Sequence, residues 1–307
     1  MTFVQPGDRI AVTGATGFVG QALVEHLANA GYQVVGISDR REPPARISES
    51  LYEYHCADLV RGWPKVKSIK GLVHLAGLAS VGLSFDSPQA YIDTNSAMVT
   101  HLFEHALRQD WGGRAIIVSS GAIYGGTGDN SGFTENSPSV PTSPYVVSKL
   151  LVEHQTEYYR RRGVDALVCR PFNHIGPGQG PGFIVPDLAM KVGNWRPDKT
   201  LAVGNLDSVR DYTDVRDIVW AYRLLLERPH PRYTTYNICS GAACSGWEVL
   251  EEVCAAVRKP IPPTTVTGHR TIDPSTITGN AERLRLETGW EPTIKLRTSI
   301  DDFIAFG

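Results

Sequence analysis

Short apolar runs alternate with longer amphipathic stretches along the first half of the chain, and the alternation resumes near residue 215. Apolar runs of this length, bounded by glycine or polar residues, are typical of buried strands. We therefore expect strands at residues 9–13, 33–38, 52–56, 71–75, 115–119, 166–170 and 235–239.

The amphipathic stretches carry apolar residues three or four positions apart, which predicts helices. In the first stretch Val19, Leu23 and Leu27 share one face, and a later helix opens with the capping box Ser245-x-x-Glu248. Because strands and helices alternate, we expect an α/β fold with a doubly wound parallel sheet of the Rossmann type. Apart from the helix that opens with this capping box, the expected helices lie at residues 17–30, 88–108, 144–162, 215–226 and 296–306.

The chain changes in character after residue 170. Residues 171–186 hold four prolines and four glycines, which predicts a long loop with fixed bends. A long loop inside a compact domain more often binds a ligand than links domains. Shorter elements follow without any repeat, so the second half predicts a smaller mixed α/β lobe packed on the first.

Bulk composition excludes several classes of function. The 307 residues carry a net charge of −2, which gives no general attraction for nucleic acid or for an anionic membrane. No apolar run reaches the roughly 20 residues of a membrane helix, and the first residues lack the pattern of a signal peptide. Since the five cysteines show no CxxC spacing, we expect reduced thiols, no metal site and a cytoplasmic protein.

A glycine-rich turn joins the first predicted strand to the first predicted helix. Gly14, Gly17 and Gly20 follow GxxGxxG spacing, with Phe18 and Val19 between the last two. Glycine lets backbone N–H groups approach a pyrophosphate at the N-terminus of a helix. Such a turn alone can be a mere tight connection, but its position between strand and helix favours dinucleotide binding.

The second predicted strand ends in Ser38-Asp39-Arg40-Arg41. An acidic side chain at this point binds the adenosine ribose of NAD(H), whereas arginine accommodates the 2′-phosphate of NADP(H). Asp39 therefore favours NAD(H), Ser38 and Arg40 favour NADP(H), and Arg41 fits a solvated charge. The sequence leaves the preference between the two cofactors open.

A candidate catalytic group consists of Ser120, at the end of a predicted strand, and of Tyr145 and Lys149 on one predicted helix. Positions i and i+4 share a helix face, so the phenol and the ammonium group can meet one bound molecule. A YxxxK pattern alone is more often an exposed helix face. Its place after a glycine turn and a serine-ended strand favours catalysis instead.

Hydride transfer with a nicotinamide ring also requires a proton to move at the substrate oxygen. The usual tyrosine pKa of about 10 is too high for a base near neutrality, and lowering it by about three units takes roughly 4 kcal/mol. We expect Lys149, helped by an oxidised nicotinamide ring, to supply this stabilisation. Ser120 would orient the substrate oxygen, and in carbonyl reduction Tyr145 would donate the proton.

These motifs, in this order, resemble the extended short-chain dehydrogenase/reductases, which bind NAD or NADP. The resemblance implies that Asp58 and Leu59 contact the adenine. It also implies that Leu75, Ala76 and Gly77 form a turn that faces the cofactor.

Within that superfamily the chain is similar to the NDP-sugar epimerases and dehydratases, and most of all to the reductases that convert GDP-4-keto-6-deoxy-D-mannose to GDP-D-rhamnose. The resemblance implies NAD(P)H-dependent reduction of the C4 ketone of a nucleotide-linked 4-keto-6-deoxyhexose, with the rhamnose or talose epimer as product. It is carried by residues 170–179, 182–186, 203–217, 236–241 and 288–290.

The same resemblance implies that Asn173 and Arg270 hold the substrate's diphosphate and that Arg210 binds a phosphate or the ribose. Two guanidinium groups and an amide can clamp a diphosphate without a basic protein overall. The alternatives are that Asn173 bonds loop backbone and that Arg270 is a surface charge. His174 fits a structural hydrogen bond and a substrate contact equally well.

Ala122 bears on the type of reaction. Dehydratases of this group carry an acidic residue at or beside this position, so alanine disfavours 4,6-dehydration. The rhamnose-forming reductases often carry an acidic residue too, and this departure leaves the product epimer open. A dTDP-linked ketosugar reductase and a UDP-sugar 4-epimerase remain alternatives. So does a non-catalytic NAD(P)-sensing protein, although such proteins generally lose the tyrosine or the lysine.

The resemblance also implies a homodimer, because relatives pair through two helices that correspond to residues 88–108 and 144–162. We expect residues 1–170, joined by part of 203–240, to form the cofactor-binding domain. Residues 171–202 and 241–307 are expected to form the lobe that binds the substrate, a nucleotide-diphosphate sugar.

Overall fold

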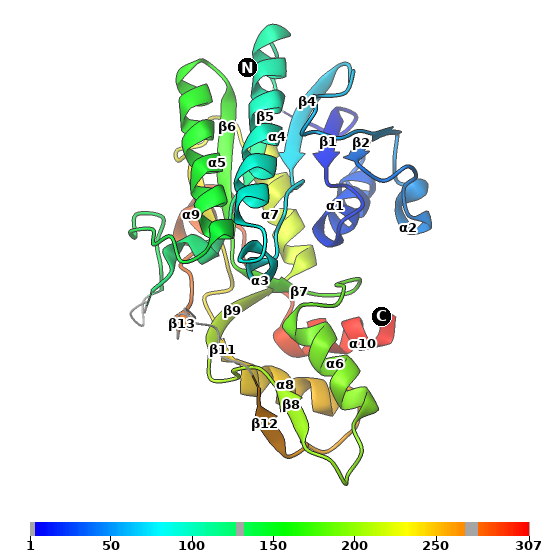
Figure 1. Cartoon of the computed structure of the whole chain (residues 1–307). Coiled ribbons are helices and arrows are strands. Elements are labelled where there is room, and N and C mark those ends of the chain that lie inside the picture. The colour runs from blue at the N-terminus through cyan, green and yellow to red at the C-terminus, as the bar shows by residue number, and fades with distance from the viewer. Residues whose placement is uncertain (1–3, 127–131, 268–275, 307) are drawn as a thin grey trace.

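The computed structural model describes residues 4–126, 132–267 and 276–306. Its main feature is a seven-stranded sheet in the order β10-β6-β5-β4-β1-β2-β3, in which every neighbouring pair is parallel (Figure 1). The strands are β1 Arg9–Thr13, β2 Gln33–Ser38, β3 Glu53–Cys56, β4 Ile69–His74, β5 Arg114–Val118, β6 Asp165–Pro171 and β10 Thr235–Ile238.

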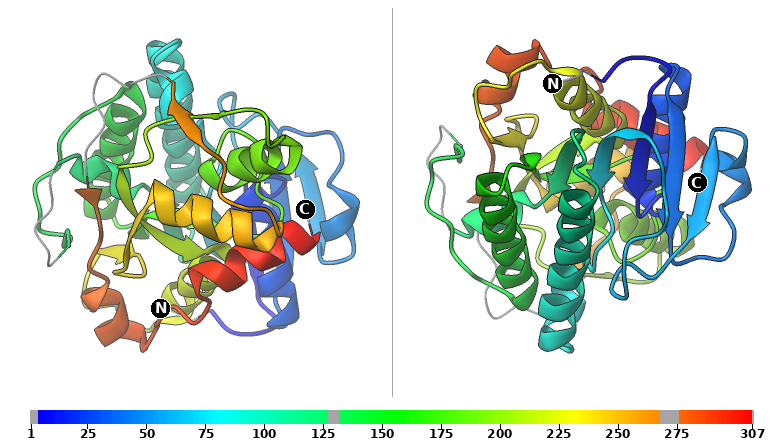
Figure 2. Two further views of the ribbon diagram at one scale, coloured as in Figure 1. Left: turned by 90° about the horizontal axis from the view of Figure 1, so that it is seen from below. Right: turned by 90° about the horizontal axis from the view of Figure 1, so that it is seen from above.

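Helices cover both faces of this sheet (Figure 2). On one face lie α4 Pro88–Arg108 and α5 Pro144–Arg161, and on the other lie α1 Phe18–Asn29 and α7 Val215–Glu227. Alternate residues of a strand point to opposite faces. Accordingly Ile10 and Val12 pack with the α1 and α7 side chains, whereas Ala11 packs with those of α4 and α5.

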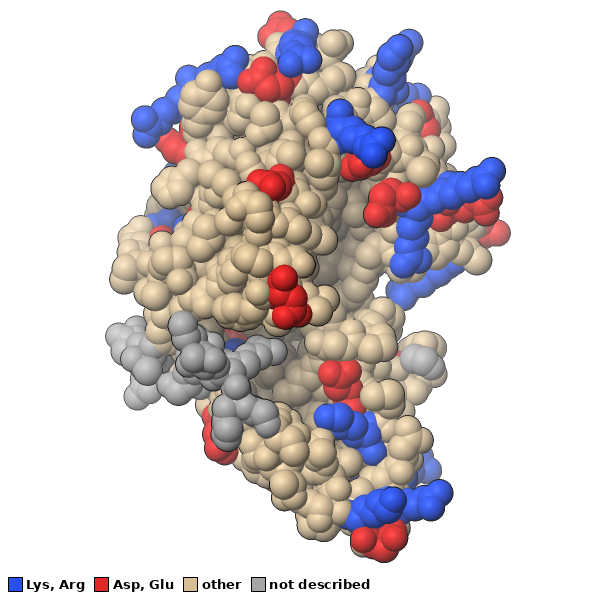
Figure 3. All heavy atoms as spheres, in the orientation of Figure 1, with Lys and Arg blue, Asp and Glu red and all other residues tan. Residues whose placement is uncertain are grey.

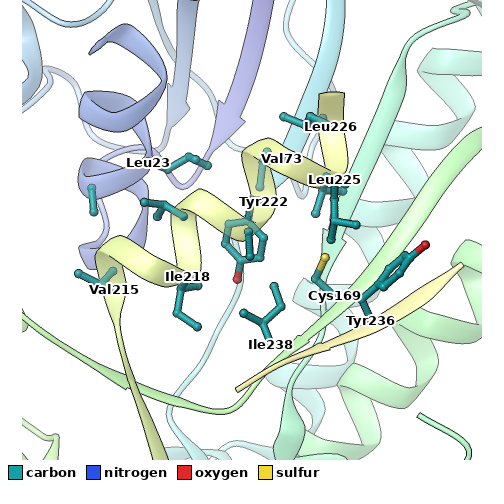
Figure 4. Close-up of a cluster of buried hydrophobic side chains, with 14 of the residues drawn as sticks. Leu23, Val73, Cys169, Val215, Ile218, Tyr222, Leu225, Leu226, Tyr236 and Ile238 are labelled. Carbon is teal, nitrogen blue, oxygen red and sulfur yellow. The ribbon is translucent and has the colours of Figure 1, made fainter. Parts of the chain in front are cut away.

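In the core under α7, a helix from the second half of the chain covers the sheet. Ile218, Tyr222 and Leu225 of this helix lie over the sheet beside Cys169 of β6 and Ile238 of β10 (Figure 4). All five side chains are fully buried. Apolar burial of this kind contributes roughly 1.5–3 kcal/mol per large side chain.

A smaller group of elements lies beyond the carboxyl ends of the large sheet's strands (Figure 1). Its central strand β9 pairs with β7, β11 and β13, and a separate ladder joins β8 to β12. Helices α6, α8 and α10 pack around a second apolar core. The bounds are β7 Asn173–Ile175, α6 Ile184–Asn194, β8 Leu201–Val203, β9 Val209–Asp214, β11 Ala243–Ser245, α8 Gly246–Ala256, β12 Thr264–Val266, β13 Thr276–Ile277 and α10 Leu296–Phe306.

Buried polar contacts join this smaller group to the large sheet. The carboxylate of Asp211 in β9, fully buried, accepts hydrogen bonds from the backbone N–H groups of Ser240 and Gly241, just after β10. It also accepts one from the N–H of Gly279, after β13. Four short elements complete the described chain: α2 Ala45–Ser48, α3 Val81–Ser84, the 3₁₀ turn η1 Gly121–Tyr124 and α9 Glu282–Thr288.

The predicted α/β sheet is confirmed, and the expected strands and helices lie within about two residues of those observed. The capping box at Ser245 and Glu248 is present in full. One prediction is wrong: residues 171–186 are not one continuous loop, because β7 forms within them and α6 begins at Ile184. Pro186 lies in the first turn of α6, where a missing N–H costs nothing. None of the described helices combines the length and apolar composition needed to cross a membrane.

Candidate active site

The glycine-rich turn lies where β1 gives way to α1, at the carboxyl edge of the large sheet. Gly14 has a φ of +66°, and a Cβ there would lie 2.9 Å from the backbone nitrogen of Ala76. A Cβ on Gly20 would lie 2.9 Å from the carbonyl carbon of Ala15, inside contact distance. Only glycine therefore lets the turn, α1 and the segment after β4 approach so closely.

The N-terminus of α1 is open to an anion. Gly17 is the N-cap and offers no side-chain acceptor, and the first turn holds no acidic residue. Phe18 and Val19, both half-buried, are the first two residues of the helix. The first N–H groups of a helix have no partner within it and carry partial positive charge. This turn thus fits the pyrophosphate of a dinucleotide, as the spacing predicted.

Thr13 holds the neighbouring turn in place. Its hydroxyl oxygen accepts hydrogen bonds from the backbone N–H groups of Leu75 and Ala76, over 3.1 and 3.2 Å. With both lone pairs used, the hydroxyl donates to Nδ1 of His74, 2.9 Å away. The fully buried imidazole is therefore neutral and carries its proton on Nε2. Burial, with the charge of Lys149 adding to it, lowers the pKa of His74 to about 3.

The turn after β4 continues to Gly77, which lies beside the lysine of the YxxxK pattern. A Cβ on Gly77 would lie 3.9 Å from the Lys149 Nζ atom. Leu75 and Ala76 are half-buried, and Gly77 is exposed. The structure therefore brings this turn, the glycine turn and the helix α5 to one place, as expected for a cofactor site.

The predicted ribose and adenine contacts lie at the ends of β2 and β3. Ser38 is buried, and its hydroxyl lies 2.7 Å from that of Thr16 in the glycine turn. Asp39 and Arg40 are exposed next to it. After β3, Asp58 is exposed and bonds the N–H of Val60, while Leu59 is buried. All lie at the same sheet edge as the glycine turn.

Tyr145 and Lys149 lie in the first two turns of α5. Pro144 is at the first helical position, and the Ser143 hydroxyl caps the helix by accepting the N–H of Val146. The Lys149 ammonium lies 5.8 Å from the centre of the tyrosine ring. The predicted shared face of the two side chains is therefore observed.

The pKa of Tyr145 shifts in the direction opposite to the one expected. Burial raises the pKa of Tyr145, and an interaction with Ser120 works against this shift. The expected lowering is thus not produced by the protein alone, because desolvation of the phenolate outweighs the hydrogen bond with Ser120. Burial also lowers the pKa of Lys149 to about 8, against the favourable charge of Glu153. The ammonium group donates a hydrogen bond to the Val118 carbonyl at 2.9 Å.

Ser120 begins the 3₁₀ turn η1 directly after β5. Its hydroxyl accepts a hydrogen bond from the Ala122 N–H and contributes to the environment of the Tyr145 phenol. Ala122 is half-buried. The structure therefore brings together the serine, tyrosine and lysine, and Ala122 lies two residues after the serine.

The sequence reasoning missed Asn95 in α4. Its side-chain oxygen accepts the backbone N–H of Leu78, and its amide nitrogen donates to the Leu78 carbonyl. The same nitrogen donates to the Ser148 hydroxyl, which itself bonds the Tyr145 carbonyl. Asn95 thus joins the turn after β4 to α5. A buried asparagine in an apolar helix face was the available signal.

The predicted substrate contacts lie on the smaller group of elements. Asn173 in β7 is exposed and pairs in register with Tyr212 of β9. Arg210, two residues before Tyr212, therefore lies on the same face of this sheet. Its guanidinium donates to the Val209 carbonyl and has a further interaction. Arg270 lies outside the described residues.

His174 connects the smaller group to the glycine turn. Its ring is stacked on that of Phe18, with 6.0 Å between centroids and 14° between planes. Its Nδ1 lies 3.0 Å from the Phe172 carbonyl oxygen, which agrees with the expected structural hydrogen bond of this residue.

On the face shown in Figure 3 the charged side chains of both signs lie mainly around the edge of that face, and its hollowed middle is largely uncharged.

Comparison with known proteins gives a consistent picture. The chain is 30% identical to GDP-6-deoxy-D-mannose reductase of Pseudomonas aeruginosa over 95% of both chains. It is also 30% identical to UDP-glucose 4-epimerase of Streptomyces lividans, over 92% of this chain and 91% of the relative.

Solved structures agree with the sequence comparisons. RMD from Pseudomonas aeruginosa, solved with NADPH, superposes with a TM-score of 0.82 at 29% identity, over 97% of this chain and 98% of that one. UDP-glucose 4-epimerase from Thermus thermophilus, solved with NAD, gives a TM-score of 0.84 at 26% identity, over 97% and 98%.

The structural relatives therefore include complexes with either cofactor. No cluster of three or more potential metal ligands occurs among the residues that the structure describes. The model of the NAD dependent epimerase/dehydratase family matches residues 10–239, which include the glycine turn, the serine and the YxxxK pattern. The chain belongs to the NAD-dependent epimerase/dehydratase family, and it is an NAD(P)-dependent enzyme.

Proposed function

We propose that the enzyme reduces the C4 ketone of a nucleotide-linked 4-keto-6-deoxyhexose with NAD(P)H. GDP-4-keto-6-deoxy-D-mannose is the proposed substrate, and GDP-D-rhamnose or its talose epimer the product. The observation that carries this proposal is the meeting of Ser120, Tyr145 and Lys149 beside the glycine turn. Similarity to the reductase and, at 29% identity over 80% of this chain, to a GDP-6-deoxy-D-talose 4-dehydrogenase supports the substrate class.

The cofactor would be held by the open N-terminus of α1, the three glycines of the turn and the residues at the ends of β2, β3 and β4. When bound, the reduced nicotinamide supplies a hydride. Tyr145 then donates its phenolic proton to the ketone oxygen, which becomes the hydroxyl of the product, and Ser120 orients that oxygen. Lys149 stabilises the resulting phenolate until it takes a proton again.

The substrate's diphosphate would lie along the smaller group of elements. Asn173 and Arg210 share a sheet face there, and we propose that Arg270 joins them. In this proposal residues 1–170 with part of 203–240 bind the cofactor. Residues 171–202 and 241–307 bind the sugar nucleotide.

A 4-epimerase acting on a UDP-sugar is the second candidate, since an epimerase is as similar in sequence as the reductase. A dTDP-linked ketosugar reductase is a third. Cofactor turnover separates the reductases from the epimerase, because a reductase consumes NAD(P)H stoichiometrically and an epimerase returns its cofactor to the starting state. Ala122 itself does not exclude an epimerase, which needs no acid at that position.

The deciding experiment offers the protein GDP- and dTDP-4-keto-6-deoxy sugars with NADH or NADPH, and UDP-glucose with NAD. We expect loss of absorbance at the reduced nicotinamide band with the GDP-sugar, and an NMR spectrum of the product that identifies the C4 epimer. Interconversion of UDP-glucose and UDP-galactose without net cofactor consumption would overturn the proposal in favour of the epimerase.

We also propose a homodimer formed by α4 and α5, which pack against each other along one side of the large sheet. Val147 and Tyr158 of α5 are apolar side chains exposed there, and a second copy would cover them. Sedimentation showing only monomer at micromolar concentration would refute this. The free, scattered thiols support a cytoplasmic location.

A further inference from the structure

A cavity separate from the candidate active site lies near the other end of α4. Its volume is about 430 Å³, within the range of pockets that hold small ligands. It is bounded by the segment between β3 and β4, by β4 itself and by the last turns of α4. Its residues gather near the amino end of β4, whereas the candidate catalytic residues follow the carboxyl ends of the strands.

Three aromatic side chains form part of the wall of this cavity. The Trp111 indole donates its N–H to the Ile69 carbonyl at 2.8 Å, so the ring is fixed and its polar group satisfied. The Trp63 ring lies 6.2 Å from the His105 ring, tilted by 34°. Burial and then the charge of Arg108 lower the pKa of His105, so this imidazole is a neutral third wall at pH 7.

The deeper wall is aliphatic, and the opening is not. Leu72, Leu102 and Ala106 are almost fully buried and close the bottom of the cavity. The two tryptophans are only partly buried. Such a lining suits a ring system that packs against aromatic side chains.

One fixed charge lies at the rim. Lys67 lines the cavity and is exposed, its ammonium group has no hydrogen bond or ion pair with another described residue, and no carboxylate is among the lining residues. The nearby carbonyls at the end of α4 are already occupied. Ala106 and Leu107 accept the N–H groups that follow the helix. Lys67 therefore gives the lining one group that can bind an anion.

We propose that this cavity binds a planar aromatic anion, with its ring against Trp63 and Trp111 and its acidic group at Lys67. The site is distinct from the dinucleotide and sugar sites. It does not depend on which nucleotide sugar the enzyme uses.

The test uses anilinonaphthalene sulfonate, an aromatic anion whose emission rises in apolar surroundings. The whole protein is titrated in the presence of saturating NADP⁺ or NAD⁺, which blocks the dinucleotide site. We expect one molecule bound per chain, with quenching of tryptophan fluorescence. Lys67→Gln should weaken binding at least fivefold. Lys70→Gln, a matched exposed lysine of β4 outside the cavity, should leave the affinity unchanged.

The uncharged relative N-phenylnaphthylamine tests the contribution of the rings without that of the negative charge. It should bind the wild type and Lys67→Gln equally. Ala106→Phe should fill the cavity and abolish binding of both probes. If that variant fails to fold by circular dichroism, Trp63→Leu at the rim should weaken both probes at least fivefold. The proposal is overturned if the probe is displaced by the dinucleotide. It is also overturned if neither probe binds, or if neither Lys67→Gln nor Trp63→Leu changes the affinity for anilinonaphthalene sulfonate.

Discussion

The Thr13 hydroxyl donates a hydrogen bond to Nδ1 of His74 at the junction of the two innermost cofactor turns. The same hydroxyl oxygen accepts two backbone N–H groups from the turn after β4. A protonated imidazole would carry an N–H at Nδ1, which would face the O–H of Thr13, so that two donors would meet. The cofactor side of the enzyme therefore depends on a neutral histidine.

Acid should unfold the protein partly through this residue. The pKa of His74 is lowered to about 3, against an unfolded value of about 6.5, so between these values only the unfolded chain binds the proton. Stability from this source is complete above pH 6.5 and is lost as the pH falls, by about 1.4 kcal/mol per unit. Urea unfolding of His74→Gln at pH 4.5 and 7 should show a difference between the two pH values that is about 2.5 kcal/mol smaller than in the wild type. His154→Gln, an exposed control, should behave as wild type.

Tyr145→Phe should lower turnover by about 10² to 10⁴, the usual contribution of a positioned acid or base. Cofactor affinity, measured by quenching of intrinsic fluorescence, should change less than twofold, since only a hydroxyl is removed. Tyr158→Phe on the exposed side of the same helix is the matched control and should retain full turnover. Unchanged turnover in Tyr145→Phe would refute the proposed role of this phenol.

Lys149→Met should make the folded protein more stable at neutral pH while abolishing turnover. The pKa of Lys149 is lowered to about 8, below the unfolded value of about 10.4, so the buried charge costs stability in full below pH 8. That cost is relieved as the pH rises to about 10.4. After loss of the hydrogen bond to Val118, we expect a net gain of about 1–2 kcal/mol at pH 7 that vanishes near pH 9 and becomes a net loss by about pH 10.4. Urea unfolding at both pH values tests this, with the exposed Lys65→Met as control.

Gly20→Ala should disrupt the cofactor turn, because the new methyl group would press on the Ala15 backbone. We expect a loss of roughly 2–4 kcal/mol of stability, or failure to bind NAD(P) where the fold survives. Gly193→Ala is the matched control, since it is also a helical glycine but has open space around its Cβ position. It should be stabilising by roughly 0.5–1 kcal/mol. Both effects can be read from thermal unfolding with and without cofactor.

Much of the cofactor side was predictable from the sequence because its determinants are local. The glycines of the turn, the apolar strand before them and the four-residue spacing of Tyr145 and Lys149 are all short-range patterns. Their physical cause, close backbone approach or a shared helix face, does not need distant residues to be known.

The parts that were missed depend on distant partners. The strand β9 reads VRDYTD, with no apolar alternation, because the group it buries is the Asp211 carboxylate. That carboxylate is satisfied by N–H groups and a hydroxyl that lie 29 to 68 residues away. Asn95 likewise bonds residues 17 and 53 positions away. The pKa of Tyr145 was expected to fall, and it rises because burial is a property of the whole fold.

The path of the chain through the large sheet has a consequence for how the protein forms. After β6 the chain builds β7, α6, β8 and β9 elsewhere, and only then supplies α7 and β10. Until residue 238 has emerged from the ribosome, β6 is an unpaired edge, and the apolar residues that α7 later covers face water. A nascent chain arrested in this interval would be prone to aggregate. Synthesis past β10 is therefore the step that protects the first half of the chain from aggregation.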